Sequence, residues 1–265
     1  MPRQVTAFSN ATVKLLRSLR DKKARRTEGL FLAEGLRILT EARNSGRLPD
    51  IVAFSAEGAR HPLAAEIIAA TEAAGGDAIE TTPDILAKMS GKDNPQMLLG
   101  SYRQPDTALE RIDRTTAPLW IVAQALRDPG NIGTILRTGD AVGAGGLILI
   151  DDCADAFSVE AVRASMGAIF TQQVATARWE EFVPWLRSGQ GQLVGTSLKA
   201  TSDYLETEYR QPCFLLIGNE QQGLPSEYEA ECDLLVKIPM AGRADSLNAA
   251  MATAVMAFAI KASWR

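Results

Sequence analysis

The sequence predicts an α/β protein of two domains, and three observations lead to this expectation. Segments that read as strands alternate with segments that read as helices along nearly the whole chain. A polar stretch at residues 104–117 lacks a sustained apolar period, which is typical of a linker. The chain has 265 residues, of which 46% are hydrophobic and 23% charged, and this suits one large or two modest globular domains.

The first predicted domain spans residues 1–105. Asn10 can cap a helix whose apolar residues form one stripe, namely Val13, Leu15, Leu16 and Leu19. A basic turn follows at residues 21–26. Apolar segments expected to form strands lie at residues 30–33, 51–54, 78–79 and 97–99. Helices are expected between them at residues 36–42, 62–74 and 83–89.

The second predicted domain spans residues 116–265. Its strands are expected at residues 119–123, 146–150, 173–175, 192–195, 213–217 and 234–238, mostly separated by helical stretches. The last helix, residues 249–260, is apolar nearly all round. That pattern is typical of a buried helix or of one that faces a dimer partner.

Composition excludes several classes of protein. No apolar run approaches the roughly 20 residues that span a bilayer, and the start of the chain lacks a signal-peptide core, so a cytoplasmic protein without a membrane partner is expected. The cysteines, Cys153, Cys213 and Cys232, form no C-x-x-C pair, which argues against disulfides and a zinc site. The single histidine, His61, lies far from any candidate nucleophile, so a Ser-His or Cys-His hydrolase is not expected.

Charge is distributed unevenly along the chain. Residues 1–47 hold eleven Lys/Arg against four Asp/Glu, a net charge of +7, so the remainder carries −11 of the total of −4. A basic end on an acidic chain indicates an anionic partner such as RNA, although a solvated helix face would show the same charges. The candidate RNA contacts are Lys22, Lys23, Arg25 and Arg26, together with Arg163 in the second domain.

Residues 128–138 follow a strand and open a helix. Asn131 is expected at the helix start and Arg137 about two turns inside it. The glycines here, with the Asp-Asp pair at residues 151–152 after the next strand, would also suit a dinucleotide fold. Because the spacing is G-x-x-G without the leading G-x-G, the tight pyrophosphate turn is missing, and a nicotinamide-dependent oxidoreductase is the alternative reading.

Two later segments place polar residues at the ends of strands. Gly218 lets the backbone turn sharply after the strand at residues 213–217, and Glu220 then lies at the carboxyl edge where α/β sheets hold their sites. Residues 238–248 join the last strand to the last helix. Asp245 or Ser246 can cap that helix, whose positive end suits an anion.

Together and in order, these three segments resemble the three motifs of the SpoU/TrmH-type RNA 2′-O-ribose methyltransferases. Residues 162–170, and residues 12–16 and 29–35 of the first domain, are also similar to family sequences, so the resemblance covers almost the whole chain. One departure is Gln221, which stands where relatives commonly have glycine. The resemblance implies an N-terminal L30e-like substrate-binding domain and a C-terminal SPOUT α/β domain with a trefoil knot.

The resemblance also implies S-adenosylmethionine as methyl donor, no metal, structured RNA as substrate and a homodimer. Ribosomal RNA is the expected target and transfer RNA the alternative. The implied catalytic residues are Arg137, Asn131, Glu220, Ser246 and Asn248. The implied donor-binding residues are Gly218, Ile238, Met240, Leu247 and Thr196. A third reading is a relative that binds RNA without activity, which the joint retention of the catalytic set disfavours.

Family accounts describe the arginine matched by Arg137 as a general base. Guanidinium has a pKa above about 12, so the neutral form is costly to reach. Arg137 is therefore expected to act as a charged donor that stabilises the developing alkoxide of the ribose.

Overall fold

The structure, a computed structural model, describes residues 2–219, 222–243 and 245–265. The chain divides into two compact units, of which the first contains Met1–Pro105 and Asp155–Phe170 and the second Asp106–Ala154 and Thr171–Arg265. Residues 155–170 fall inside the range predicted for the second domain but pack within the first unit. The domain ranges 1–105 and 116–265 stay predictions.

The first unit is built on a sheet with the strand order β1-β4-β3-β5-β2. Its strands are β1 (Arg3–Val5), β2 (Leu30–Glu34), β3 (Ile51–Ser55), β4 (Asp77–Thr81) and β5 (Leu98–Arg103). Its helices are α1 (Ala11–Ser18), α2 (Lys22–Glu28), α3 (Leu36–Asn44), α4 (Pro62–Ala73), α5 (Pro83–Ser90) and α7 (Val159–Ala164). The apolar stripe of α1 is buried as expected, since Leu16 and Leu19 are fully inaccessible in one core with β3 and β4.

Two features of this unit differ from the expectation. Residues 21–26 are not a turn but the start of α2, because the Asp21 carboxylate accepts hydrogen bonds from the backbone of Lys23 and Ala24. Gly29, with φ of +65°, ends the helix. Strand β1 was not expected either, because three residues are too few to show a period.

Residues 155–170 complete an aromatic cluster of the first unit. Phe157 lies 5.2 Å from Phe31 between ring centroids, and Phe170 lies 4.7 Å from Tyr102. Ahead of α7, the Asp155 carboxylate pairs with Arg25 of α2 across 2.6 Å. The segment is thus held to β2, β5 and α2 by both apolar packing and an ion pair.

The second unit is a parallel sheet with the order β10-β12-β9-β11-β6-β7-β8. Its strands are β6 (Leu119–Gln124), β7 (Gly146–Ile150), β8 (Gln173–Ala177), β9 (Gln192–Thr196), β10 (Ser202–Asp203), β11 (Cys213–Ile217) and β12 (Leu234–Lys237). Its helices are α6 (Pro129–Val142), α8 (Trp179–Arg187), α9 (Ser226–Glu231) and α10 (Ala249–Ala262). The alternation of strands and helices confirms the predicted α/β class.

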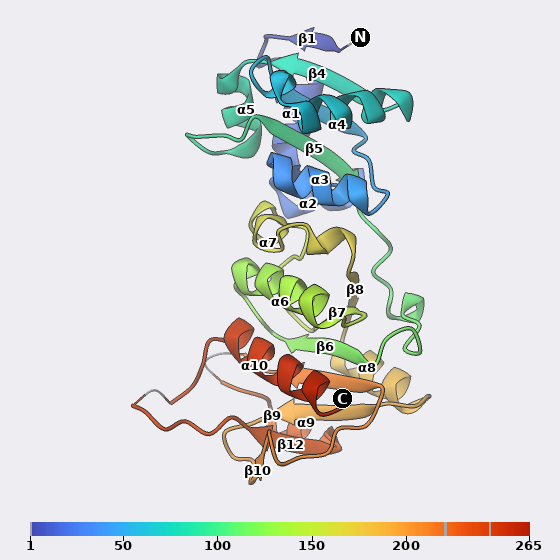
Figure 1. Ribbon diagram of the computed structural model, residues 1–265, viewed down its shortest axis with the longest axis vertical. Helices are drawn as coiled ribbons and strands as arrows, with labels where there is room; N and C mark the ends of the chain where they lie inside the picture. The colour runs from blue at the N-terminus through green and yellow to red at the C-terminus, as the bar shows by residue number, and fades with distance from the viewer. Residues whose placement is uncertain (1, 220–221, 244) are drawn as a thin grey trace. The chain divides into compact units, whose positions relative to one another are not determined.

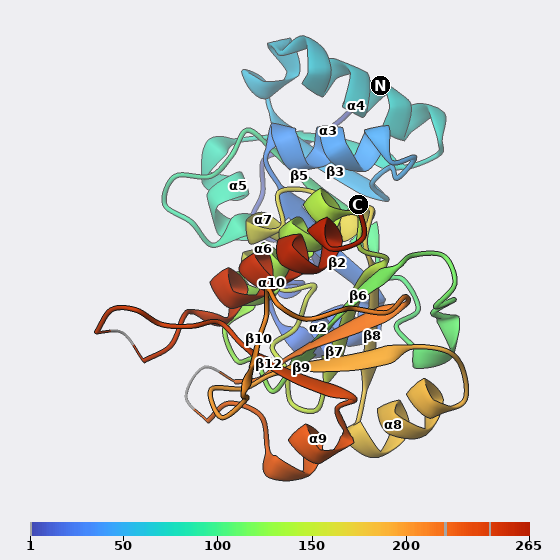
Figure 2. The ribbon, with the colours of Figure 1, turned by 60° about the horizontal axis from the view of Figure 1, so that its bottom comes forward.

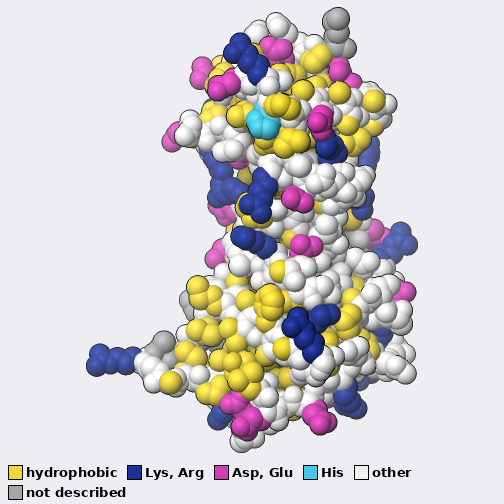
Figure 3. All heavy atoms as spheres, in the orientation of Figure 1, with side chains coloured by type: hydrophobic (Ala, Val, Ile, Leu, Met, Phe, Trp, Pro, Cys, Tyr) yellow, Lys and Arg dark blue, Asp and Glu magenta, His cyan; other side chains and the backbone are white. Residues whose placement is uncertain are grey.

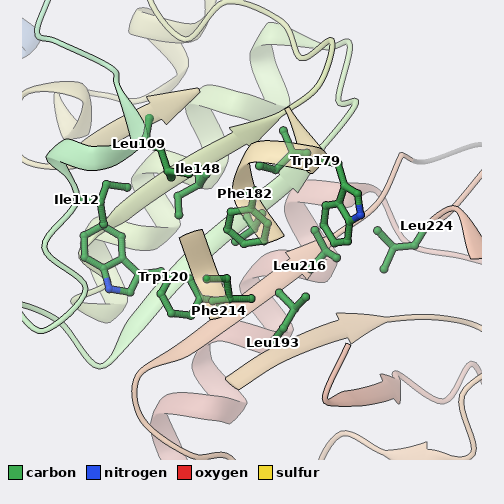
Figure 4. Packing of buried hydrophobic residues seen from close by; sticks show 14 residues of the cluster. Leu109, Ile112, Trp120, Ile148, Trp179, Phe182, Leu193, Phe214, Leu216 and Leu224 are labelled. Atoms are coloured by element: carbon green, nitrogen blue, oxygen red, sulfur yellow. The ribbon is translucent and has the colours of Figure 1, made fainter. Parts of the chain in front are cut away.

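Helices cover both faces of this sheet. Figure 1 shows α6 and α10 lying side by side, and Figure 2 shows α8 and α9 on the opposite face. Because side chains alternate along a strand, Trp120 and Val122 of β6 point to the α8 side while Ile121 and Ala123 point to the α6 side. Figure 4 shows Trp120, Phe182 and Phe214 converging in the core on the α8 side. Because the strands are parallel, their carboxyl ends lie along one edge of the sheet between these two helical layers.

Candidate active site

A cavity of about 370 Å³ lies at the carboxyl edge of β9, β11 and β12. The neighbouring strands are parallel, so their carboxyl ends meet at one edge and can share a site. The cavity is lined by all five residues predicted to bind the donor, Thr196, Gly218, Ile238, Met240 and Leu247. Ser246, predicted to be catalytic, lines it as well. Residues that are up to 51 positions apart in the chain thus meet in one hollow, and their individual roles remain predictions.

Residue 218 must be a glycine because the backbone of Gly223 and Leu224 passes too close to it to leave room for a side chain. A Cβ atom at this position would lie 2.6 Å from the carbonyl carbon of Gly223 and 2.7 Å from the backbone nitrogen of Leu224. A hydrogen bond from the Gly223 N–H to the carbonyl of Asn219, 2.9 Å long, holds the two stretches of backbone this close together. The cavity wall here is bare backbone, which suits recognition of a ligand by main-chain groups. Glu220 and Gln221 lie outside the described residues.

Asn248 connects the third segment to the first. Its side-chain oxygen accepts from the backbone N–H groups of Ala250 and Met251, so it caps α10. Its Nδ2 donates to Oδ1 of Asn131 at 3.0 Å. The predicted caps, Asp245 and Ser246, are therefore wrong, because the helix begins at Ala249 and only Asn248 adjoins its first turn. Capping fixes the orientation of the amide that reaches Asn131.

The first segment forms the start of α6, which Asp128 caps by accepting from the N–H of Gly130. Asn131 is in the first turn and is buried, whereas Arg137 is exposed further along the helix. The structure therefore brings Asn131 and Asn248 together, whereas Arg137 is exposed on α6 and is not among the residues that line the cavity.

A loop contact that the sequence did not predict joins two strand ends. The Asn219 side chain donates to the carbonyl of Ala125 at 3.0 Å, linking the loops after β11 and β6. Ala125 has φ of +50°, a conformation that non-glycine residues seldom adopt. Such strain is typical of functional loops.

The cavity also has polar residues that the sequence did not indicate, among them Ser197, Lys199 and Glu229. Ser197 and Lys199 follow β9 directly, and their position after a parallel strand was the available signal. Glu229 is on α9, which showed no motif. Within the described residues no cluster of His, Cys, Asp or Glu could hold a metal ion.

The predicted RNA contacts divide into two kinds. Lys22, Lys23 and Arg26 are exposed on α2, and Arg163 is exposed on α7. Arg25 is only 3% exposed, and besides its pair with Asp155 it donates to the carbonyls of Leu19 and Arg20. The prediction that Arg25 contacts RNA is corrected, because its guanidinium is buried and its donors are used inside the first unit.

Comparison with known proteins identifies the family of this site. The sequence model described as the SpoU rRNA Methylase family matches residues 118–258, which contain the whole cavity. The chain belongs to the SpoU rRNA methylase family. A second model, the MRM3-like substrate binding domain, matches residues 10–100. The predicted family and the predicted methyltransferase class are thereby confirmed, and the oxidoreductase alternative is not supported.

SpoU relatives cover nearly the whole chain. An AdoMet-bound rRNA methyltransferase from Sinorhizobium meliloti is 38% identical with a TM-score of 0.90, covering 98% of this chain and 97% of that one. The 23S rRNA (uridine(2479)-2′-O)-methyltransferase of Streptomyces viridochromogenes is 31% identical, covering 98% of this chain and 92% of the relative. The 23S rRNA (guanosine(2553)-2′-O)-methyltransferase RlmP of Bacillus subtilis is 28% identical, covering 98% and 99%.

Proposed function

We propose that this protein transfers a methyl group from S-adenosylmethionine to a ribose 2′-hydroxyl of ribosomal RNA. The observation that carries this proposal is the single cavity that gathers the donor-binding candidates beside the Asn131–Asn248 contact. Bare backbone at Gly218 and a largely apolar lining fit an adenosyl group, which needs a flat apolar slot and main-chain partners. Relatives named for 23S rRNA support ribosomal RNA over transfer RNA.

The reaction needs positioned groups more than it needs a strong base. S-adenosylmethionine supplies a methyl group bound to a positively charged sulfur. As the ribose 2′-oxygen bonds to that carbon, the carbon–sulfur bond breaks and the hydroxyl proton leaves to water. The exposed Arg137 guanidinium stabilises the negative charge that develops on the 2′-oxygen. Asn131 and Asn248 hold the ribose in line with the donor.

Arg137 variants test this assignment. Arg137→Ala should lower methyl transfer at least a hundredfold while leaving donor affinity nearly unchanged, because the donor is held by the loops after β9, β11 and β12. Arg137→Lys should also fail largely, because an ammonium lacks the planar fork. Turnover near that of the wild type in either variant, with saturating donor and RNA, would remove Arg137 from the mechanism. Mapping 2′-O-methyl groups in RNA from a deletion strain would identify the target and would separate ribosomal from transfer RNA.

RNA capture is assigned to the first unit. Six exposed cations lie on α1, α2 and the turn between them, and within the described residues none forms an ion pair: Lys14, Arg17, Arg20, Lys22, Lys23 and Arg26. Unpaired cations on one stretch of surface suit RNA phosphates, whose neutralisation gives most of the salt-dependent affinity. All six cations lie within residues 10–100, the range matched by the MRM3-like substrate binding domain model.

A homodimer is proposed from the outer face of α10. Met251, Val255 and Phe258 are 63%, 37% and 54% exposed and lie on one stripe of this helix, while Ala249 and Ala252 of the same helix line the cavity. Figure 3 shows hydrophobic side chains gathered where α10 reaches the surface. We propose that a second copy of this chain covers the stripe, because α10 also lines the cavity and a partner bound there would enclose the site. Phe258→Asp should convert a dimer into a monomer in sedimentation, and a wild-type monomer would refute the proposal.

Two further parts of the assignment rest on family membership. The trefoil knot is proposed from membership of the SpoU family; α10, which follows the third motif, packs on α6, β6 and β11. Pulling the chain from both ends would leave a knotted protein shorter than its full contour length. A cytoplasmic location is proposed from the ribosomal substrate. No helix of the described residues is long and apolar enough to cross a membrane.

A further inference from the structure

Glu229 is an acidic side chain in the cavity to which the mechanism above gives no task. It lies on α9, and its side chain is only 14% exposed. The Ser197 hydroxyl donates to Oε1 at 2.6 Å, and Lys199 Nζ lies 3.8 Å from Oε2. A carboxylate can accept about four hydrogen bonds, so this one keeps capacity for a ligand in the cavity.

Neighbouring residues hold this carboxylate in place. Tyr228, the residue before it, stacks on Trp179 with ring centroids 3.8 Å apart and an interplanar angle of 6°. The Tyr228 hydroxyl donates to Asp151 at 2.9 Å. Burial and then this hydrogen bond raise the pKa of Tyr228, so the hydroxyl keeps its proton and the bond at neutral pH. Glu229 is therefore presented from an anchored helix.

The strand order shows which half of a donor would meet Glu229. Asn131 follows β6, and Ser197, the partner of Glu229, follows β9; β11 lies between these strands. Two strand spacings of about 4.8 Å separate them by roughly 10 Å. Since the reacting methyl group must lie near Asn131 and Arg137, the adenosyl half of the donor extends towards β9 and Glu229.

We propose that Glu229 binds the 2′- and 3′-hydroxyls of the donor's own ribose. This inference rests on the proposed function. The cis-diol offers two O–H donors that a carboxylate can accept together, and dinucleotide folds use an acidic residue in the same way. The ring nitrogens of adenine are acceptors and would repel a carboxylate, and its 6-amino group is a single donor site, whereas the cis-diol offers two adjacent O–H donors. Ser197 orients Glu229, and Lys199 offsets part of its charge.

Three ligands and one matched control test the proposal by calorimetry. The ligands are S-adenosylhomocysteine, methylthioadenosine, which lacks the amino-acid part, and 2′,3′-dideoxy-methylthioadenosine, which also lacks the diol. The variants are Glu229→Gln and Glu229→Ala. The control is Glu227→Gln, which makes the same charge change at an exposed position of the same helix. Thermal unfolding of each variant checks that it folds.

Glu229→Gln and Glu229→Ala should weaken methylthioadenosine and S-adenosylhomocysteine alike, roughly ten- to a hundredfold, and should not weaken the dideoxy ligand further. Glu227→Gln should bind all three as the wild type does. Equal losses for methylthioadenosine and its dideoxy form would overturn the diol contact. A loss confined to S-adenosylhomocysteine would overturn it in favour of the donor's ammonium group. If the wild type bound none of the three, the donor site itself would fail, and this result is distinct from the others.

Discussion

The side chain of Asn248 donates to that of Asn131 across 3.0 Å, joining two residues that lie 117 positions apart in the chain. The same Asn248 side chain caps α10 through its oxygen. One amide therefore uses its oxygen for the helix and its nitrogen for the neighbouring segment. This division of roles makes the two functions separable by substitution.

Asn248→Asp should keep the cap and lose the contact, because a carboxylate accepts the two N–H groups but has no amide hydrogen for Asn131. Asn248→Ala should lose both. In urea unfolding, the alanine variant should be less stable than the aspartate variant by about 1 kcal/mol. Both variants should lose most methyl transfer. Full activity in the aspartate variant would show that the contact with Asn131 is dispensable.

Gly218→Ala tests the bare backbone wall. The added methyl group would meet the backbone of Gly223 and Leu224, which cannot move aside as a flexible side chain can. We expect donor affinity to fall at least tenfold in calorimetry. Gly143→Ala is the control for loss of a glycine outside the cavity. Nothing lies within 4 Å of its Cβ position, although its φ of +70° predicts a stability loss of about 1 kcal/mol without a change in donor affinity.

Helix α2 offers a matched comparison between RNA binding and stability. Replacing Lys22, Lys23 and Arg26 by alanine should weaken RNA binding and flatten its log-log salt slope by ~0.7–0.9 per lost phosphate contact. The free energy of unfolding should change little, since these side chains are exposed. If affinity and salt slope both survive the triple substitution, the RNA path runs elsewhere.

Arg25→Ala should lower the stability of the protein and leave its RNA binding unchanged. It leaves the largely buried Asp155 carboxylate without its cation and the carbonyls of Leu19 and Arg20 without a donor. We expect a loss of about 3 kcal/mol of stability in urea unfolding. RNA affinity, measured where the variant is folded, should retain its salt slope. A stable Arg25→Ala protein with a reduced slope would restore the original prediction for Arg25.

Native thiols should be inert. Burial raises the pKa of Cys153 to about 11 and those of Cys213 and Cys232 to about 12. Only thiolates react with a disulfide reagent, so at pH 8 the folded protein should show almost no labelling, and all three thiols should react in urea. Because unfolded thiols ionise near pH 8.5, these groups favour the folded state less as the pH rises from there towards 11. Rapid labelling of the native protein at pH 8 would contradict this burial.

The residues that line the cavity could be predicted because Gly218, Ile238 and Leu247 lie in segments that resemble the motifs of the family. The α/β pattern by itself indicated only that the segments after β11 and β12 lie at the carboxyl edge of the sheet. The sequence could not show that Arg25 is buried while Lys22 is exposed. A partner 130 positions away, Asp155, decides its burial, and four adjacent cations carry no sign of which one turns inward. Glu229 was missed for a similar reason, since only the folded position of α9 brings it to the cavity.

The placement of residues 155–170 in the first unit has a consequence for synthesis on the ribosome. When residue 105 has been made, Phe31 and Tyr102 still lack Phe157 and Phe170, and Arg25 lacks Asp155. At roughly 5–20 residues per second, the remaining segment arrives about 3–13 s later. During that interval the aromatic rings of Phe31 and Tyr102 lack the cover that Phe157 and Phe170 give them in the folded unit.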